Sequence, residues 1–347
     1  MTTDNAGLAE LLAREAERVQ GTLRRAFKRA ARAAFLWPIE AGELLKQERS
    51  LTELTAVGPY IERRLKRWLQ RPPHDLEPPP IRRGFLTLSQ AKMALSRKGE
   101  WQKQYRGDLQ MHSHWSDGAG SIRHMAEAAQ ERGYEYIAIT DHSQGLKIAG
   151  GITEAELAQQ MEEIRRYNDG CKARRQTFRV LCSLEMNLNP RGGGDMAESI
   201  LKKLDLVVGS FHSKLREKTD QTDRYLAALN NPCVNILGHP VGRVYNFRVG
   251  LSADWHRVCA RAAQLDKALE IDAYPDRQDL STELLKIAKT EGARIAINTD
   301  AHAPEQLAFV ELGLAAALMA GIPAERIVNF MPLDKLLAWA KPKAKKK

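Results

Sequence analysis

Apolar residues between positions 7 and 70 recur at helical spacing, three or four residues apart, as on the buried face of a helix. The residues that set this spacing are Leu8, Leu11, Leu12, Leu23, Phe27, Ala30, Ala31 and Ala34. Prolines at positions 72, 73 and 78–80 cannot continue a helix. The pattern predicts a small all-helical domain over residues 1–71, a linker over 72–105, a larger domain over 106–335 and a basic tail over 336–347.

Beyond residue 106 the pattern changes to short apolar runs, which are typical of buried strands. These runs cover residues 136–140, 178–184, 206–209, 234–237, 268–271 and 294–297. Helix signals lie between them: Ser121 with Gly133, the capping box Thr153/Glu156, Ser252, and Pro304 as a first-turn residue. Alternating strands and helices of this length favour an α/β fold with a parallel sheet, either open or closed into a barrel.

Composition narrows the class of protein. A chain of 347 residues can form one large domain plus a small one. Four cysteines, at positions 171, 182, 233 and 259, form no Cys-x-x-Cys pair, which argues against a disulfide framework or a cysteine-ligated zinc site. No apolar stretch approaches the roughly 18 residues that a membrane span needs. We therefore expect a soluble, cytoplasmic protein with no membrane partner.

The net charge of +10 is unevenly distributed. Residues 1–105 hold 20 Lys and Arg against 12 Asp and Glu, and five further lysines lie between residues 341 and 347, so the remaining body is slightly acidic. A basic flank on an acidic body fits a polyanion-binding module joined to a cation-binding one. The alternative is that the basic residues serve solubility alone.

The string HSHWSDG at residues 112–118 introduces the candidate chemistry, with two histidines at i and i+2 followed by an aspartate. Taken alone, such a pair is also common on protein surfaces. However, each strand-like run is closely followed by a charged or metal-capable residue, and the carboxyl ends of parallel barrel strands open on one face. In chain order these residues are Asp141 with His142, Glu185, His212, His239, Asp272, and Asp300 with His302. The pattern predicts a cluster of imidazoles and carboxylates.

Such a cluster suits the hydrolysis of phosphate esters. That reaction needs a deprotonated water and neutralisation of charge on the phosphoryl group, and clustered divalent cations supply both. Mixed imidazole and carboxylate ligands favour zinc, manganese or iron over magnesium.

Six blocks, GDLQMHSHWSDG, AITDHS, SLEMNL, VVGSFHS, ILGHPVGR and NTDAHAP, resemble in this order the motifs of the polymerase-and-histidinol-phosphatase (PHP) family of metal-dependent phosphoesterases, over roughly residues 106–330. The resemblance implies a distorted seven-stranded (βα) barrel related to the TIM barrel, with three divalent ions of zinc, manganese or iron, and with manganese supporting activity. The implied ligands are His112, His114, Glu185 and Asp300 for one metal, Glu185, His212 and His239 for a second, and Asp117, His142 and His302 for a third. It also implies a metal-bound hydroxide, held by Glu185, His212 and Asp300, that attacks phosphorus in line.

Other polar residues receive weaker assignments. His74, His124 and His256 lie in the linker or in expected helices and are predicted not to be ligands. Asp141 is predicted to orient an imidazole, the alternative being a helix cap. Lys147 and Arg243 follow ligand motifs and are predicted to contact phosphate, the alternative being solvated loop charges.

Two further stretches, GLKIAGGI (145–152) and LEIDAYPDRQDL (269–280), resemble the C-terminal PHP domain of bacterial family X DNA polymerases, with Asp272 in place of the asparagine usual there. Residues 51–69 resemble the helix-hairpin-helix of their DNA-binding domain, in which backbone N–H groups approach a phosphate. Gly58 fits the second hairpin glycine, but Ala56 replaces the first. The alternative is a plain turn in a helical bundle.

The chain has no Asp-x-Asp pair and no room for a polymerase palm, so polymerase activity is not predicted. We expect a metal-dependent phosphoesterase that acts on DNA, single-stranded or at 3′ ends, as a 3′-5′ exonuclease or in processing DNA ends or abasic sites in repair. One alternative is a small-molecule phosphomonoesterase of the histidinol-phosphatase type. Another is a non-catalytic DNA-binding accessory, against which the complete ligand set argues.

Overall fold

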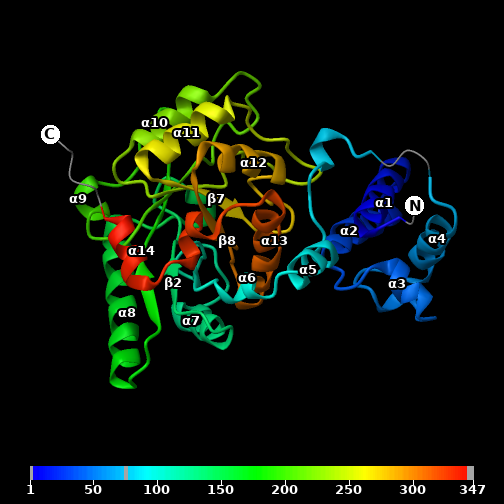
Figure 1. The fold of residues 1–347 in the computed structure, drawn as a ribbon, viewed down its shortest axis with the longest axis horizontal. Coiled ribbons are helices and arrows are strands. Elements are labelled where there is room, and N and C mark those ends of the chain that lie inside the picture. Colours follow the sequence, from blue (N-terminus) through cyan, green and yellow to red (C-terminus); the bar gives the residue numbers. More distant parts are fainter. Residues whose placement is uncertain (1–2, 74–76, 342–347) are drawn as a thin grey trace.

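The computed structural model describes residues 3–73 and 77–341. His74 and the lysines beyond residue 341 lie outside these ranges. Within them, a helical unit at the N-terminal end of the chain lies beside a larger α/β body (Figure 1). No helix of the described residues is long and apolar enough to cross a membrane.

The α/β body is a barrel of parallel strands. Its strands are β1 (Gly107–Asp108), β2 (Tyr136–Ile139), β3 (Arg179–Cys182), β4 (Glu185–Asn187), β5 (Val208–Ser210), β6 (Ile236–Gly238), β7 (Ala268–Asp272) and β8 (Arg294–Asn298). They form two ladders, β1-β2-β3 and β4-β5-β6-β7-β8. Because only two residues separate β3 from β4, these two segments act as one bent strand, and the parallel bridges His142–Glu185 and Met111–Ala301 connect the ladders at both joins. The predicted distorted seven-stranded barrel is confirmed.

Helices surround this barrel (Figure 1). They are α7 (Ile122–Glu131), α8 (Glu154–Ala173), α9 (Glu198–Leu201), α10 (Thr222–Asn230), α11 (Trp255–Leu265), α12 (Thr282–Glu291), α13 (Val310–Ala320) and α14 (Leu333–Ala340). The capping box of Thr153 and Glu156 opens α8 as predicted. The predicted start at Ser252 is wrong: Asp254 caps α11 by accepting a hydrogen bond from the backbone of Arg257, and a carboxylate two residues further on therefore sets this boundary.

The barrel interior is apolar towards the amino ends of the strands. Buried residues of α14, Leu336 and Ala340, pack on Tyr136, Val208 and Ala296 inside the barrel. This packing closes one end of the barrel, so that polar side chains can gather only at the opposite end, where the strands terminate.

Four helices make up the N-terminal unit: α1 (Asn5–Arg18), α2 (Gly21–Ala33), α3 (Ala41–Lys46) and α4 (Pro59–Gln70). Trp37 is buried in its core and its indole donates a hydrogen bond to the carbonyl of Thr55 at 3.0 Å. Ala56, which stands at the first hairpin glycine position, has a φ of 64°, in the left-handed region that favours glycine. The backbone thus makes a glycine-type turn here despite the alanine, and the helix-hairpin-helix itself stays a prediction.

The segment predicted as a linker contains two helices, α5 (Leu88–Ser96) and α6 (Glu100–Lys103). Trp101 of α6 donates from its indole to the carbonyl of Leu314 in α13 at 3.2 Å. The second half of the predicted linker therefore packs on the barrel, and the predicted domain boundaries stay a prediction.

A buried arginine joins the helical unit to the barrel. Arg82 has only 6% of its side chain exposed and contacts Glu10 at 2.7 Å and Glu17 at 2.6 Å, both on α1. The same guanidinium donates to the side-chain oxygen of Asn246, in the loop after β6, at 3.0 Å. An aromatic cluster beside it joins residues from three segments, Phe35, Phe85 and Tyr245, whose ring centroids lie 4.7 to 6.2 Å apart.

Replacing Arg82 by methionine is expected to lower the free energy of unfolding by about 3 kcal/mol, because the buried carboxylate of Glu10 then loses one of its two arginine partners and keeps only Arg14. Arg83 is the matched control, since its ion pair with Glu77 has exposed fractions of 51% and 74%. Arg83→Met should cost less than about 1 kcal/mol. Urea unfolding followed by circular dichroism measures both, and equal effects would contradict the role given to Arg82.

Candidate metal centre

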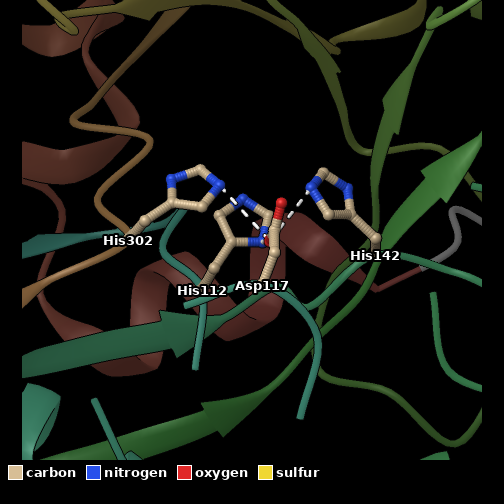
Figure 2. Close-up of side chains that lie close together, drawn as sticks. All are labelled: His112, Asp117, His142 and His302. Atoms are coloured by element: carbon tan, nitrogen blue, oxygen red, sulfur yellow. Dashed lines mark ion pairs between the residues drawn. The ribbon is translucent and has the colours of Figure 1, made fainter. Parts of the chain in front are cut away.

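Side chains from the carboxyl ends of the strands converge at the open end of the barrel. The structure brings together eight of the nine predicted ligands: His112, Asp117, His142, Glu185, His212, His239, Asp300 and His302. Figure 2 shows four of them, His112, Asp117, His142 and His302, pointing towards one another.

Glu185, the first residue of β4, lies at the centre of this cluster and is fully buried. Its Oε2 is 2.6 Å from Nδ1 of His142 and 3.7 Å from Nε2 of His112. Its Oε1 is 2.8 Å from Nε2 of His239 and 3.3 Å from Nε2 of His212. Each carboxylate oxygen thus faces its own pair of imidazoles, which is the arrangement that a carboxylate bridging two cations requires.

Asp117 gathers a second set of imidazoles (Figure 2). Its Oδ1 is 3.5 Å from Nε2 of His142 and 3.4 Å from Nε2 of His302. His112 stacks against both of these rings, with centroid separations of 4.3 Å. On its other side, Nε2 of His112 lies 3.0 Å from Oδ1 of Asp300.

Two of these residues have unusual backbone conformations. His239 follows β6 with a φ of 24°, and Asp300 follows β8 with a φ of 51°. Such conformations cost on the order of 1 kcal/mol or more for residues other than glycine, and they persist only where the surroundings hold them. A 2.6 Å hydrogen bond from the backbone N–H of His239 to the carboxylate of Glu270 holds the first turn, which lets the imidazole approach Glu185.

The charges in the cluster depend on one another. Burial alone would raise the pKa of Glu185, but the charges of His142 and His212 hold it well below its ordinary value. Burial lowers the pKa of His142, whereas Glu185 and Asp117 outweigh burial and raise it to about 10. Burial also opposes a charge on His302, but the hydrogen bond to Asp117 raises its pKa to about 9. The carboxylates therefore need positive charge around them, which protons or metal cations can supply.

The donor set fits divalent metals. Two groups, His112/Asp117/His142/His302 and His142/Glu185/His212, each offer ligand atoms that lie within 4.8 Å of one another. Nδ1 of His112 is buried and lacks a hydrogen-bond partner among the described residues, a cost that a cation would remove. Nitrogen and carboxylate ligands suit zinc, manganese or iron.

Asp141 supports the site differently from the prediction. Its carboxylate accepts hydrogen bonds from the backbone of Ser113 at 2.8 Å and the hydroxyl of Ser116 at 2.5 Å, and from Gln160 at 2.6 Å. It therefore holds the loop that carries Asp117, rather than an imidazole.

Sequence reasoning missed Arg277, which lies at the edge of the cluster. Its Nε is 3.7 Å from Oδ2 of Asp300 and 3.6 Å from Oδ2 of Asp272. Burial and the charge of Asp300 raise the pKa of Asp272 well above its ordinary value. The raised pKa favours the neutral form of Asp272. A neutral carboxyl group has a hydrogen-bond donor group and an acceptor oxygen, as does the asparagine that is usual at this position in the family X polymerases. In the sequence, Arg277 was marked only by its place in the block at 269–280. Its contact with Asp300 could not be foreseen, because it joins two segments that are distant along the chain.

Three predicted residues lie apart from the cluster. The imidazole of His114 is exposed and makes no hydrogen bond or ion pair among the described residues, so its role as a ligand stays a prediction. Lys147 is also exposed, in a 3₁₀ turn (Lys147–Ala149). Arg243 stacks on the ring of Phe85 at 3.8 Å and donates to the carbonyl of Gly84 at 2.7 Å. Its guanidinium is thus engaged in packing the preceding segment on the barrel, not in the site.

Two of the histidines predicted not to be ligands, His124 and His256, lie in the part of the chain that the structure describes. Both lie outside the two metal groups. His124 is in α7, and His256 of α11 pairs with Glu291 on the surface at 2.8 Å.

The chain is similar to several known proteins. Residues 108–300 match the PHP domain family. The chain is 41% identical over 239 residues to the DNA polymerase/3′-5′ exonuclease PolX of Bacillus subtilis, a match covering 69% of this chain but only 41% of that protein. It is 28% identical to a probable phosphatase of Thermoanaerobacter sp., over 65% of this chain and 90% of the relative. Among solved structures, histidinol phosphate phosphatase of Lactococcus lactis, complexed with zinc, L-histidinol and phosphate, is 19% identical with a TM-score of 0.45, over 63% of this chain and 95% of that one.

Glu185→Gln is expected to lower the metal content of the purified protein and to weaken metal affinity at least about tenfold, because the neutral amide lacks the negative charge that balances a divalent cation. Elemental analysis and titration with Mn²⁺ measure both quantities. Glu291→Gln is the matched control, because it alters another Glu–His pair at 2.8 Å outside the cluster. Metal content that is equal in the two variants would contradict the assignment.

Proposed function

The chain belongs to the PHP domain family of metal-dependent phosphoesterases, and from this we propose that it hydrolyses nucleic-acid phosphodiesters, as a 3′-5′ exonuclease or in processing DNA ends or abasic sites during repair. The observation that carries the proposal is the buried Glu185 carboxylate between imidazoles at the open end of the barrel. The preference for nucleic acid is supported by the 41% identity to the Bacillus DNA polymerase/3′-5′ exonuclease over 239 residues. Less than half of that protein is matched, so its whole activity is not carried over.

In this proposal the barrel holds three divalent ions of zinc, manganese or iron. The residues that would hold them are His112, His114, Asp117, His142, Glu185, His212, His239, Asp300 and His302. When bound, such ions lower the pKa of water and neutralise charge on a phosphoryl group.

The chain's own residues supply orientation and charge. Asp141 fixes the loop that carries Asp117, and Glu270 fixes the turn at His239. Arg277 keeps 31% of its side chain exposed beside Asp300, where its planar guanidinium is placed to bind a non-bridging phosphate oxygen. We assign to Arg277 the phosphate contact that sequence reasoning gave to Arg243.

DNA is the partner that the helical unit favours. Residues 1–105 carry 20 basic against 12 acidic residues, and Arg63 and Arg67 of α4 are exposed. Gly58 caps the N-terminus of α4, where free backbone N–H groups favour a phosphate. Arg82 fixes this unit on the barrel, so that a strand bound there is presented to the metal centre.

A second candidate is a small-molecule phosphomonoesterase. The specific observation in its favour is the match to the probable phosphatase, which covers 90% of that protein with 65% of this chain. The helical unit would then serve another purpose.

Purified protein with Mn²⁺ is expected to shorten 5′-labelled single-stranded DNA one nucleotide at a time, which a denaturing gel resolves as a ladder. Asp300→Asn should slow this reaction at least about 100-fold, because several kcal/mol of charge stabilisation are lost. His256→Ala, at a surface histidine, is the control and should keep the rate. Fast hydrolysis of histidinol phosphate without action on DNA would favour the second candidate.

The double variant Arg63→Ala/Arg67→Ala is expected to weaken DNA binding and to flatten its salt dependence. The slope of log K against log salt should fall by about 0.7 for each phosphate of a single strand that the variant no longer neutralises. Fluorescence anisotropy between 50 and 200 mM salt, roughly the range over which counterion release is large, measures it. Lys172→Ala/Lys203→Ala removes the same charge near α8 and α9, away from the helical unit (Figure 1). An equal weakening in this control would remove the helical unit from the proposal.

A further inference from the structure

The loop after β6, residues 244–250, joins the rim of the barrel to the helical unit. The N–H of Asn246 donates to the carbonyl of Ile81 at 3.0 Å, and Tyr245 packs in the aromatic cluster with Phe35. Val244 and Arg248 pair across the loop. Phe247 follows Asn246 and is 56% exposed. The loop is thus held by its contacts with the helical unit and also carries an exposed aromatic ring.

Phe247 already binds a cation. The guanidinium of Arg216 lies over its ring, 4.6 Å from the centroid, and contacts the backbone carbonyl of Phe247 at 3.4 Å. Arg216 belongs to the loop after β5, four residues beyond the predicted ligand His212. A single exposed aromatic side chain is common on protein surfaces. Here the loop that carries the ring is held by hydrogen bonds and an arginine lies over the ring, so the ring is held in position to contact a ligand.

A row of arginines connects this ring to the metal centre. Arg248 follows Phe247 and is half-buried. The loop lies against the segment that carries Arg277, because the N–H of Tyr245 donates to the carbonyl of Asp276 at 2.7 Å and Nε of Arg243 donates to the carbonyl of Arg277 at 2.9 Å. Arg277 in turn lies 3.7 Å from Asp300. The arginines at 216, 248 and 277 therefore belong to contacting loops at the rim of the barrel, a charge pattern that suits a polyanion.

We propose that Arg277, Arg248, Arg216 and Phe247 form a track for single-stranded nucleic acid, in which the arginines contact successive phosphates and Phe247 stacks on a base next to the scissile linkage. This inference rests on the proposed function and specifies its substrate. A base in a duplex is covered on both faces by its neighbours, so an exposed ring selects an unpaired one.

The test compares two strands on the metal-loaded protein: dT15 and a 15-mer in which abasic spacers replace the bases, both with phosphorothioate linkages that slow hydrolysis. Phe247→Ala is expected to weaken binding of dT15 about tenfold and to leave the spacer strand unchanged, because stacking needs a base. Phe247→Trp should retain the preference for dT15. Met319→Ala is the matched control, since Met319 is 51% exposed on α13 without an arginine over it, and it should change neither affinity.

An equal weakening on both strands would show that Phe247 only supports the loop, and no weakening on either would show that it is not used; both outcomes overturn the inference. These outcomes do not depend on hydrolysis. A protein that fails to degrade DNA but shows the base-dependent weakening would contradict the proposed function and keep the track.

Discussion

The structure depends on one buried negative charge, the carboxylate of Glu185. Placing a charge where no water reaches it is costly unless opposite charge surrounds it, and here imidazoles from the loops after four different strands do so. Glu185 also stands where the two ladders join, directly after the bend between β3 and β4 and bridged to His142. The break in the sheet and the centre of the candidate site therefore coincide. A straight strand would continue its ladder of hydrogen bonds through residue 185 and leave the carboxylate no room for its imidazole partners.

The barrel and most of the metal centre could be predicted because their signals are local. A short apolar run followed by an imidazole or carboxylate marks both a buried strand and its carboxyl end, so local signals placed His142, His212 and His239 at strand ends, and the resemblance of six spaced blocks implied their roles as ligands. Arg243 and Arg277 show where this reasoning stops. Both follow strands and both are arginines, but Arg243 meets a ring from residue 85 and Arg277 meets Asp300. Only the packing of distant segments separates the two roles. The turn at Ala56 is a similar case, because its left-handed backbone is imposed by the surrounding helices against the preference of alanine.

The contact between the helical unit and the barrel has the character of a core rather than of a hinge. A buried guanidinium shared by Glu10, Glu17 and Asn246 loses its partners if the two parts separate, and the three rings beside it lose their apolar surroundings. The loop at 244–250 belongs to both parts, since Tyr245 lies in the core of the helical unit while Arg248 lies on the barrel rim. The two parts therefore form one rigid body at this point, and a change in either is felt at the rim.

The junction at Arg82 therefore sets the distance between the helical unit and the candidate site. The buried contacts of Arg82 hold the helical unit against the barrel, so the path from the turn at residues 54–58 to the candidate site has a set length. Under the proposed function, a strand that contacts both must contain enough nucleotides to span this path, and fragments trimmed below that length would keep only the contact with the barrel. Degradation by such an enzyme would slow at a characteristic product size, set by the distance between two parts of the fold and not by the chemistry of the bond being cut.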